Sequence, residues 1–261
     1  MIKFSAICPH PPLIVPGIGT DNESSYLKKT IHSMEMLSKN ISLCDIDTII
    51  VISPHGLVYP DRMNIWYGGE LDGDFKEFER PDIYLEFLSN DKLAQEICDS
   101  SDKNGILVNH YTENFELDHG TMVPMVYLAK HLPEDIKLVP INYSYLSAET
   151  HYKFGQTIGN ICQKRQENIA IIASGDLSHK LFDNDNVSGK EFDTTILKDL
   201  ANKNIDNILS YDEDWVIDAG ECGYKSIVTL LGAINNINYY PQVLSYESPF
   251  GIGYSVVNFK L

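Results

Sequence analysis

The sequence is short of basic residues, and this shortage excludes one class of partner. Its 261 residues include 20 lysines and arginines against 37 aspartates and glutamates, a formal net charge of −17. A surface of that sign repels the phosphate backbone of nucleic acids, and isolated basic pairs such as Lys28–Lys29 are too small to offset it. We therefore expect no nucleic-acid partner.

Long hydrophobic runs and paired cysteines are also missing. No apolar run approaches the roughly 20 residues that a membrane-spanning helix needs, and the opening residues MIKFSAI are too short and too strand-like for a signal peptide. The five cysteines are scattered and form no Cys-x-x-Cys pair, which argues against a disulfide framework and against a cysteine zinc site. We expect a cytoplasmic protein with reduced thiols and no contact with a membrane.

Common hydrolase motifs are absent as well. The chain contains no His-Glu-x-x-His, no His-x-x-Glu-His and no Gly-x-Ser-x-Gly, which argues against the metalloproteases and the serine hydrolases that carry them. What the chain does have is an ordinary globular composition, 43% hydrophobic and 22% charged, so it can bury a sizeable core.

Short apolar runs alternate with amphipathic helical stretches along the chain. Strands are predicted at residues 2–8, 47–53, 63–69, 105–111, 136–143, 168–174, 242–248 and 253–259. Helices are predicted at residues 24–40, 83–102, 121–131, 148–163, 191–200 and 224–234. This alternation predicts an α/β fold with a central, mostly parallel or mixed sheet flanked by helices on both faces. No linker or internal repeat divides the chain, so we expect a single domain over residues 1–261.

Four of the eight histidines stand where a predicted strand ends or a helix begins, and ligands bind beyond the carboxyl ends of strands in such sheets. His10 lies in CPHPP, His55 in SPHG and His179 in SGDLSH, each after a strand, while His119 lies in LDHGTMVPM at the start of a helix. Proline and glycine fix the backbone beside His10 and His55. His10 and His55 are therefore better ligand candidates than His119 and His179.

The remaining histidines have simpler interpretations. His32, His131 and His151 lie within or at the ends of amphipathic helices, so we expect them to be exposed to solvent. His110 closes a predicted strand and is ambiguous.

A stable metal site needs a third ligand, and Glu221 is the best carboxylate for it. Two glycines bracket Glu221 in DAGECGYKSIVTLLGA, directly before an apolar helix. The alternative interpretation is a carboxylate that the positive end of the helix dipole favours. Cys222 is a rival ligand, and Asp218 and Glu247 are weaker substitutes.

Two imidazoles and one carboxylate with open positions form the facial triad of non-haem Fe(II) oxygenases. The same ligands can hold Zn²⁺ with a water molecule for hydrolysis, so they do not choose the metal by themselves. His119 and His179 would lie beside the metal and move protons near neutral pH. Asp118 and Asp176 are close enough in sequence to orient them.

Five motifs in order, CPHPP, SPHG, LDHGTMVPM, SGDLSH and ECGYKSIVTLLGA, resemble the class III extradiol ring-cleaving dioxygenases of the protocatechuate 4,5-dioxygenase catalytic-subunit type. Together they span nearly the whole chain. The resemblance implies iron bound by His10, His55 and Glu221. It implies that His179 is the acid/base residue near the substrate hydroxyl and bound oxygen, and that His119 hydrogen-bonds the substrate or an oxygen intermediate.

The resemblance also implies a reaction and its partners. A catecholic aromatic diol and O₂ would be the substrates, Fe(II) the cofactor, and the ring bond beside the two hydroxyls would open. Members of the family often assemble, which implies a homo-oligomer or a small partner subunit.

The same superfamily includes Memo-like proteins, which keep the fold without a settled dioxygenase activity, and zinc-containing members that resemble plant DOPA dioxygenases. Three functions therefore stay open: an Fe(II) extradiol dioxygenase, a Memo-like metal-binding protein without that activity, and a Zn²⁺-dependent hydrolase with His179 as base. Glu221 favours the first, because Memo-like chains tend to change the carboxylate position. Cys222 beside it, as a rival ligand, keeps the other two functions open.

Overall fold

A computed structural model describes residues 1–112, 116–183 and 187–261 of the chain. Its strands are β1 Ile2–Cys8, β2 Thr48–Ser53, β3 Met63–Trp66, β4 Glu70–Phe75, β5 Arg80–Ser89, β6 Val108–Tyr111, β7 Lys137–Asn142, β8 Ile169–Ser174, β9 Tyr240–Glu247 and β10 Tyr254–Lys260. Its α-helices are α1 Asp21–Tyr26, α2 Lys28–Ile41, α3 Asp91–Lys103, α4 His119–Leu128, α5 Ala148–Cys162, α6 Ser188–Asn202, α7 Ile205–Leu209, α8 Glu213–Ala219 and α9 Tyr224–Ala233. Short 3₁₀ turns are η1 Pro12–Ile14, η2 Lys76–Phe78 and η3 Ala129–His131.

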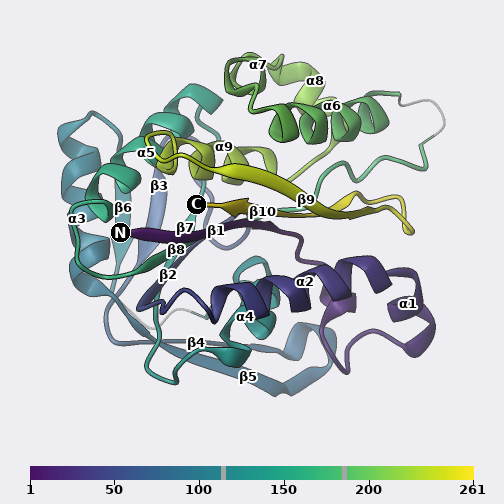
Figure 1. The fold of residues 1–261 in the computed structure, drawn as a ribbon, viewed down its shortest axis with the longest axis horizontal. Helices are drawn as coiled ribbons and strands as arrows, with labels where there is room; N and C mark the ends of the chain where they lie inside the picture. The colour runs from purple at the N-terminus through teal and green to yellow at the C-terminus, as the bar shows by residue number, and fades with distance from the viewer. Residues whose placement is uncertain (113–115, 184–186) are drawn as a thin grey trace.

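The described strands form one mixed sheet (Figure 1). Its main path runs β4-β5-β7-β2-β8-β1-β10-β9, and β3 joins β7 to β6 beside this path. The centre of the sheet is parallel, since β7, β2, β8 and β1 all run the same way. Antiparallel pairs of β4 with β5 and of β9 with β10 close the two ends. The predicted α/β fold with a mostly parallel or mixed sheet is confirmed.

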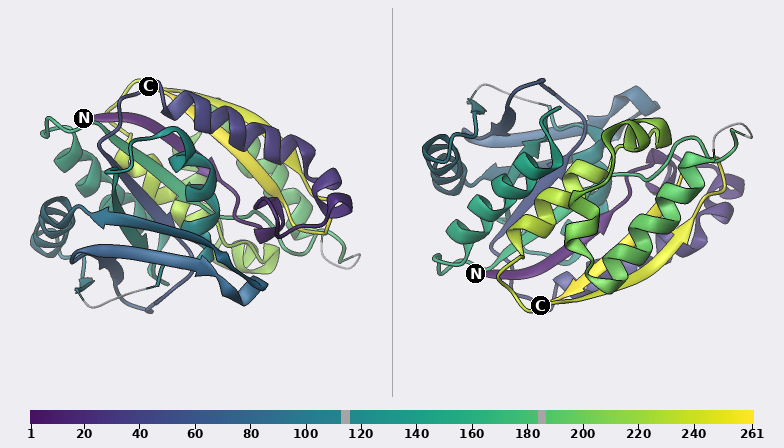
Figure 2. Two further views of the ribbon diagram at one scale, coloured as in Figure 1. Left: turned by 90° about the horizontal axis from the view of Figure 1, so that it is seen from below. Right: turned by 90° about the horizontal axis from the view of Figure 1, so that it is seen from above.

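Helices cover both faces of the sheet, and the central strands are therefore apolar on both sides. In β2, Ile50 and Ile52 pack into the core beneath α3, α5, α6 and α9, whereas Ile49 and Val51 pack into the core beneath α2 and α4. Figure 2 shows these two layers from opposite sides, with the β4–β5 hairpin on the same side as α2 and α4.

The predicted helix 83–102 is wrong in its first part. Residues up to Ser89 form β5, which pairs with β4, and α3 begins at Asp91 after Asn90, whose side chain accepts a hydrogen bond from Leu93 N. The strand-forming contacts come from β4, a partner that the local sequence pattern does not reveal, so pairing overrode the helical spacing.

A second difference concerns the stretch before the last helix. Asp214 and Asp218 lie between the predicted helices 191–200 and 224–234, in a stretch that the sequence pattern indicates as a loop, but the structure places them in α8, where the Asp212 side chain accepts a hydrogen bond from Trp215 N. Among the described helices, none combines the length and apolar character needed to cross a bilayer.

Candidate metal centre

Parallel strand ends bring the candidate residues to one edge of the sheet. His10 follows β1, His55 follows β2 and Asp176 follows β8, and these strands are neighbours in the order β2-β8-β1. Because the strands point the same way, His10 and Asp176 are in contact although 166 positions separate them in the chain. This is the edge where ligands bind in such sheets.

The position of the proton on the His10 ring follows from its neighbours. The residue is 2% exposed, and Nδ1 lies 3.0 Å from Ser174 Oγ. The Ser174 hydroxyl donates its own proton to the Gly120 carbonyl oxygen, so toward His10 it can only accept. The proton of the neutral ring is therefore on Nδ1, and Nε2 carries a free electron pair. An imidazole binds a metal through Nε2 in this form.

The free Nε2 atom of His10 faces two other imidazoles. It lies 3.0 Å from His55 Nε2, and ligand nitrogens of His10, His55 and His119 all lie within 4.8 Å of one another. The ring centroids of His55 and His119 are 4.1 Å apart. Two nitrogen ligands that are each about 2.0–2.1 Å from one ion lie roughly 3 Å apart. The spacing of His10 and His55 therefore fits a shared transition-metal ion.

Burial keeps these rings neutral. It lowers the pKa of His55 to about 4 and the pKa of His10 well below its usual value. The pKa of His119 is also lowered, again by burial first of all. Neutral imidazoles are the metal-binding form, so the cluster needs no deprotonation at pH 7 to accept a cation.

The His119 ring is held from two sides. His119 opens α4, and the preceding Asp118 caps this helix by accepting a hydrogen bond from Thr121 N at 3.1 Å. A β-carbon at Gly120 would lie 3.1 Å from His55 Cδ2, so a glycine lets α4 approach the His55 loop closely. On its other side, the His119 ring meets the edge of Phe78 in η2, with centroids 5.8 Å apart.

A second group of ligand atoms shares His10 with the first and adds Asp176 and Cys222. Cys222 Sγ lies 3.6 Å from His10 Nε2, and Asp176 Oδ2 lies 3.9 Å from the same nitrogen. Asp176 Oδ1 accepts a hydrogen bond from His10 N at 3.0 Å. Burial raises the pKa of Asp176 to about 7 and the pKa of the Cys222 thiol well above its usual value. Imidazole, thiolate and carboxylate donors together suit iron or zinc.

His179 stands beside this second group. Its Nε2 atom lies 3.7 Å from Cys222 Sγ, and burial lowers its pKa. Asp176, which was considered as a residue orienting His179, contacts His10. Asp118, considered for His119, accepts hydrogen bonds from Ser53 Oγ and Thr121 N.

Glu221 belongs to neither ligand group of the described residues. Its Oε2 atom accepts a hydrogen bond from Tyr224 N in the first turn of α9, an arrangement that matches the helix-terminus interpretation. Burial raises the pKa of this carboxyl to about 7.

Backbone contacts explain why Cys222 faces His10. The N–H groups of Cys222 and Gly223 both donate to the Asp176 carbonyl oxygen, at 3.3 and 2.9 Å. A β-carbon at Gly175 would collide with the backbone of Gly223. The two chain segments can lie this close only because both positions lack a side chain.

A cavity of about 570 Å³ lies on the Glu221 side of this segment. Four tyrosines line part of its wall, namely Tyr143, Tyr145, Tyr211 and Tyr224. Lys225 also lines it, with Nζ 3.3 Å from Ser144 O and 5.5 Å from the Tyr145 ring centroid. Glu149, Glu213 and Glu221 are the other charged residues of the wall. A cavity of this size, with aromatic walls and a limited number of polar groups, is typical of a site for a small organic molecule.

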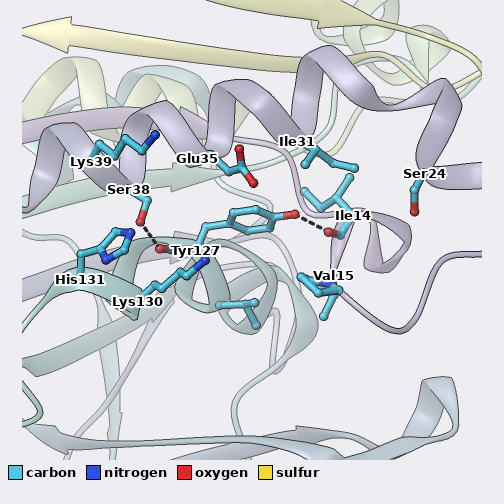
Figure 3. A pocket seen from close by; sticks show the side chains of 12 residues that line it. Ile14, Val15, Ser24, Ile31, Glu35, Ser38, Lys39, Tyr127, Lys130 and His131 are labelled. Carbon is cyan, nitrogen blue, oxygen red and sulfur yellow. Dashed lines mark hydrogen bonds between the residues drawn. The ribbon is translucent and has the colours of Figure 1, made fainter. Parts of the chain in front are cut away.

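A smaller hollow of about 340 Å³ lies between α2 and α4 (Figure 3). Tyr127 stands at its centre, donating its hydroxyl proton to Ile14 O, and Ser38 Oγ donates to Tyr127 O. None of the candidate ligands or proton-transfer residues lines this hollow.

One of the three histidines expected on the surface is not there. His32 and His131 are exposed, but His151 is fully buried. Its Nε2 atom accepts a hydrogen bond from Ser144 N, and Nδ1 lies 2.9 Å from Ser147 O. Both nitrogens have local partners, so this ring fixes the turn before α5.

Sequence reasoning missed two polar residues at the same edge, Ser174 and Asn142. Ser174 closes β8, which is otherwise apolar and buried throughout, and Asn142 closes β7, which is otherwise apolar and buried after its exposed first residue. A polar residue at the last position of a buried strand is the signal that could have identified them, because a buried polar group needs a partner.

Comparisons with known proteins confirm the family resemblance. The family model described as "Catalytic LigB subunit of aromatic ring-opening dioxygenase" matches residues 5–257. Protein CA_C1420 of Clostridium acetobutylicum is 35% identical over 97% of this chain, which spans 56% of that protein. The 3,4-dihydroxyphenylacetate 2,3-dioxygenase of Escherichia coli is 27% identical over 59% of this chain and 57% of its own length. The chain thus spans little more than half the length of these two relatives.

Two further matches extend over most of the chain. A MEMO1 family protein of Methanocaldococcus jannaschii is 22% identical over 88% of this chain and 71% of its own length. The solved structure of an uncharacterized protein from Escherichia coli K12 superposes with a TM-score of 0.69 at 15% identity, covering 98% of this chain and 99% of that one. The structural match supports the fold alone.

Proposed function

Because the chain belongs to the family of LigB catalytic subunits of aromatic ring-opening dioxygenases, we propose that it is a non-haem Fe(II)-dependent extradiol dioxygenase that opens a catecholic ring with O₂. The observation that carries the proposal is the pair of Nε2 atoms of the buried His10 and the half-buried His55, 3.0 Å apart. The name of the Escherichia coli dioxygenase relative supports the same reaction class.

In this proposal, His10 and His55 hold the iron, and the third ligand decides the character of the site. Glu221 is the ligand that the resemblance implies, but it belongs to neither group of ligand atoms among the described residues, and its Oε2 atom accepts a hydrogen bond from Tyr224 N. The sulfur of Cys222, by contrast, lies 3.6 Å from His10 Nε2. Distance therefore favours Cys222. When bound, Fe(II) would supply open positions for both oxygens of a diol and for O₂.

The surrounding residues would handle the protons. His179 has a lowered pKa, so a neutral ring is available at pH 7 to accept a proton from a substrate hydroxyl and return it later. His119 would hydrogen-bond the substrate or its oxygen atoms from the other side of His55. The aromatic body of the substrate would lie in the cavity beside Glu221, against the rings of Tyr143 and its neighbours.

A second function has its own support. A Memo-like protein that binds metal without opening rings is favoured by the thiol of Cys222 beside His10. MEMO1 family proteins match over 88% and 84% of this chain, compared with 59% for the ring-opening enzyme. A zinc-dependent hydrolase with His179 as base is the remaining alternative.

One experiment separates the three functions. The protein is loaded anaerobically with Fe(II) and given a panel of catechols, while O₂ uptake and the absorbance of ring-opened product are followed. We expect uptake that requires Fe(II) and disappears in His10→Ala but persists in His32→Ala, a control at an exposed histidine. Tight metal binding without O₂ uptake on any diol would favour the Memo-like function. Zinc-dependent ester cleavage without O₂ uptake would favour the hydrolase.

The setting of the protein belongs to the same proposal. A cytoplasmic location suits the five free thiols. We also propose assembly as a homo-oligomer or with a small partner subunit, which sedimentation of the purified protein tests.

A further inference from the structure

Asn142 occupies the point where two of the histidine-bearing segments meet. It is the last residue of β7 and is completely buried. Its side-chain amide makes three hydrogen bonds, to Trp66, His55 and Asp118. It is neither a candidate metal ligand nor a part of the cavity wall.

The orientation of the Asn142 amide is determined by Trp66. The indole Nε1–H can only donate, and it lies 2.9 Å from Asn142 Oδ1. The oxygen of the amide therefore faces Trp66, and both N–H donors face the other way. There Nδ2 donates to the His55 carbonyl oxygen at 2.5 Å and to Asp118 Oδ2 at 3.3 Å.

These two donors connect the segments that carry His55 and His119. The His55 carbonyl belongs to the loop after β2, and Asp118 directly precedes His119 and caps α4. A second connection runs parallel to the first: Ser53 Oγ accepts from His55 N at 3.2 Å and donates to Asp118 Oδ1 at 2.5 Å. Asn142 and Ser53 together fix the His55 backbone relative to the start of α4.

Backbone geometry shows how tightly the amide fits. Gly56 has a φ of +80°, and a β-carbon on it would lie 2.9 Å from Asn142 Nδ2. A side chain at this position would push the amide away from the His55 carbonyl. The glycine that follows His55 is thus needed both for the turn and for the approach of Asn142.

We propose that Asn142 is a positioning residue, which holds the imidazoles of His55 and His119 in their metal-binding arrangement through the His55 carbonyl and Asp118. The inference rests on the proposed function insofar as that function requires a metal at these histidines. It adds that metal affinity depends on a buried amide that touches neither the ion nor the substrate. Substitution of a residue that orients metal ligands without touching the metal typically lowers the metal affinity about 10–100-fold.

The test variant is Asn142→Asp. It keeps an oxygen for the Trp66 indole but removes both N–H donors, and it places a second carboxylate against Asp118. The matched control is Asn90→Asp, which alters another buried asparagine whose Nδ2 donates to Thr48 Oγ1 at 2.8 Å at the opposite end of β2. The rescue variant combines Asn142→Asp with Asp118→Asn, so that the amide and the carboxylate exchange places.

Binding of Co(II) to the metal-free protein, followed by its visible absorption, gives a readout that requires no catalysis. We expect Asn142→Asp to weaken Co(II) binding about 10–100-fold and to alter the spectrum at saturation, with a substantial part of the affinity restored in the double variant. Asn90→Asp should lower the melting temperature while leaving Co(II) affinity unchanged.

The outcomes separate the two proposals. Unchanged Co(II) affinity and spectrum in Asn142→Asp, with only a lower melting temperature, would reduce Asn142 to a structural role and overturn the inference. Wild-type protein that binds Co(II) but consumes no O₂ with Fe(II) and any catechol would overturn the proposed function and leave this inference standing. Wild-type protein that binds no Co(II) would overturn both.

Discussion

The Nε2 atoms of His10 and His55 lie 3.0 Å apart at the ends of β1 and β2, two strands that are separated in the sheet by β8. β8 provides the residue that makes the first of these nitrogens available, because its last residue, Ser174, accepts the Nδ1 proton of His10. Three neighbouring strand ends thus cooperate in one pair of ligands.

Ser174→Ala should weaken metal binding without removing a ligand. The His10 ring then has no partner for its Nδ1 proton and can exchange tautomers, so the form with a free Nε2 is less populated. We expect about a tenfold loss of Zn²⁺ affinity, measured by competition with a chromophoric chelator. Ser226→Ala, at a buried serine hydroxyl in α9 that has no hydrogen-bond partner among the described residues, is the control. Equal affinity in Ser174→Ala and wild type would contradict the assigned tautomer.

Substitution of Cys222 and Glu221 should identify the third ligand. Because Cys222 Sγ lies 3.6 Å from His10 Nε2 and shares a group of ligand atoms with it, Cys222→Ser should abolish the sulfur-to-metal charge-transfer absorption of the Co(II) protein and lower its affinity. Glu221→Gln should retain both. The opposite pattern is loss of metal in Glu221→Gln with unchanged metal affinity and spectrum in Cys222→Ser. It would identify Glu221 as the third ligand, as the family resemblance implies.

His179→Gln should separate proton transfer from metal binding. His179 lies outside the cluster of His10, His55 and His119, so the variant should retain iron, measured by elemental analysis. Loss of a positioned acid/base residue typically costs about 10²–10⁴-fold in turnover, so kcat should fall by that factor. His110→Gln, at an exposed histidine, should behave like wild type. Loss of iron from His179→Gln would instead make His179 a ligand.

Stability should fall on mild acidification, and His151 should contribute to the fall. Burial lowers the pKa of His151 from 6.5 to about 4. Between these two pH values the unfolded chain is protonated at His151 and the folded protein is not. The stability that depends on the neutral ring is complete above pH 6.5 and is lost as the pH falls toward 4.

Urea unfolding of the metal-free protein between pH 4.5 and 7 measures this effect. His151→Gln should make the slope of unfolding free energy against pH shallower by up to one proton, about 1.4 kcal/mol per pH unit. His131→Gln, at an exposed histidine, should leave the slope unchanged. A His151→Gln variant with the wild-type slope would show that other groups cause the acid sensitivity.

The strand-end histidines illustrate what the sequence could predict. Apolar, β-branched segments predicted the buried parallel strands, and proline and glycine after them predicted where those strands stop. From these two facts it followed that His10 and His55 would face the same edge of the sheet. The candidate ligands Glu221 and Cys222 could not be distinguished in this way, because they are adjacent and follow no strand.

By itself the sequence determined the alternation of strands and helices, the excess of acidic over basic residues and the pair of histidines at the candidate metal centre. Each of these depends on local pattern or composition. The tertiary structure decided which of Glu221 and Cys222 faces His10, because the contact between Gly175 and Gly223 sets the direction of that loop. It also decided that His151 is buried and that Asn142 holds the His55 carbonyl. These properties depend on partners distant in the chain, which only the folded sheet brings together.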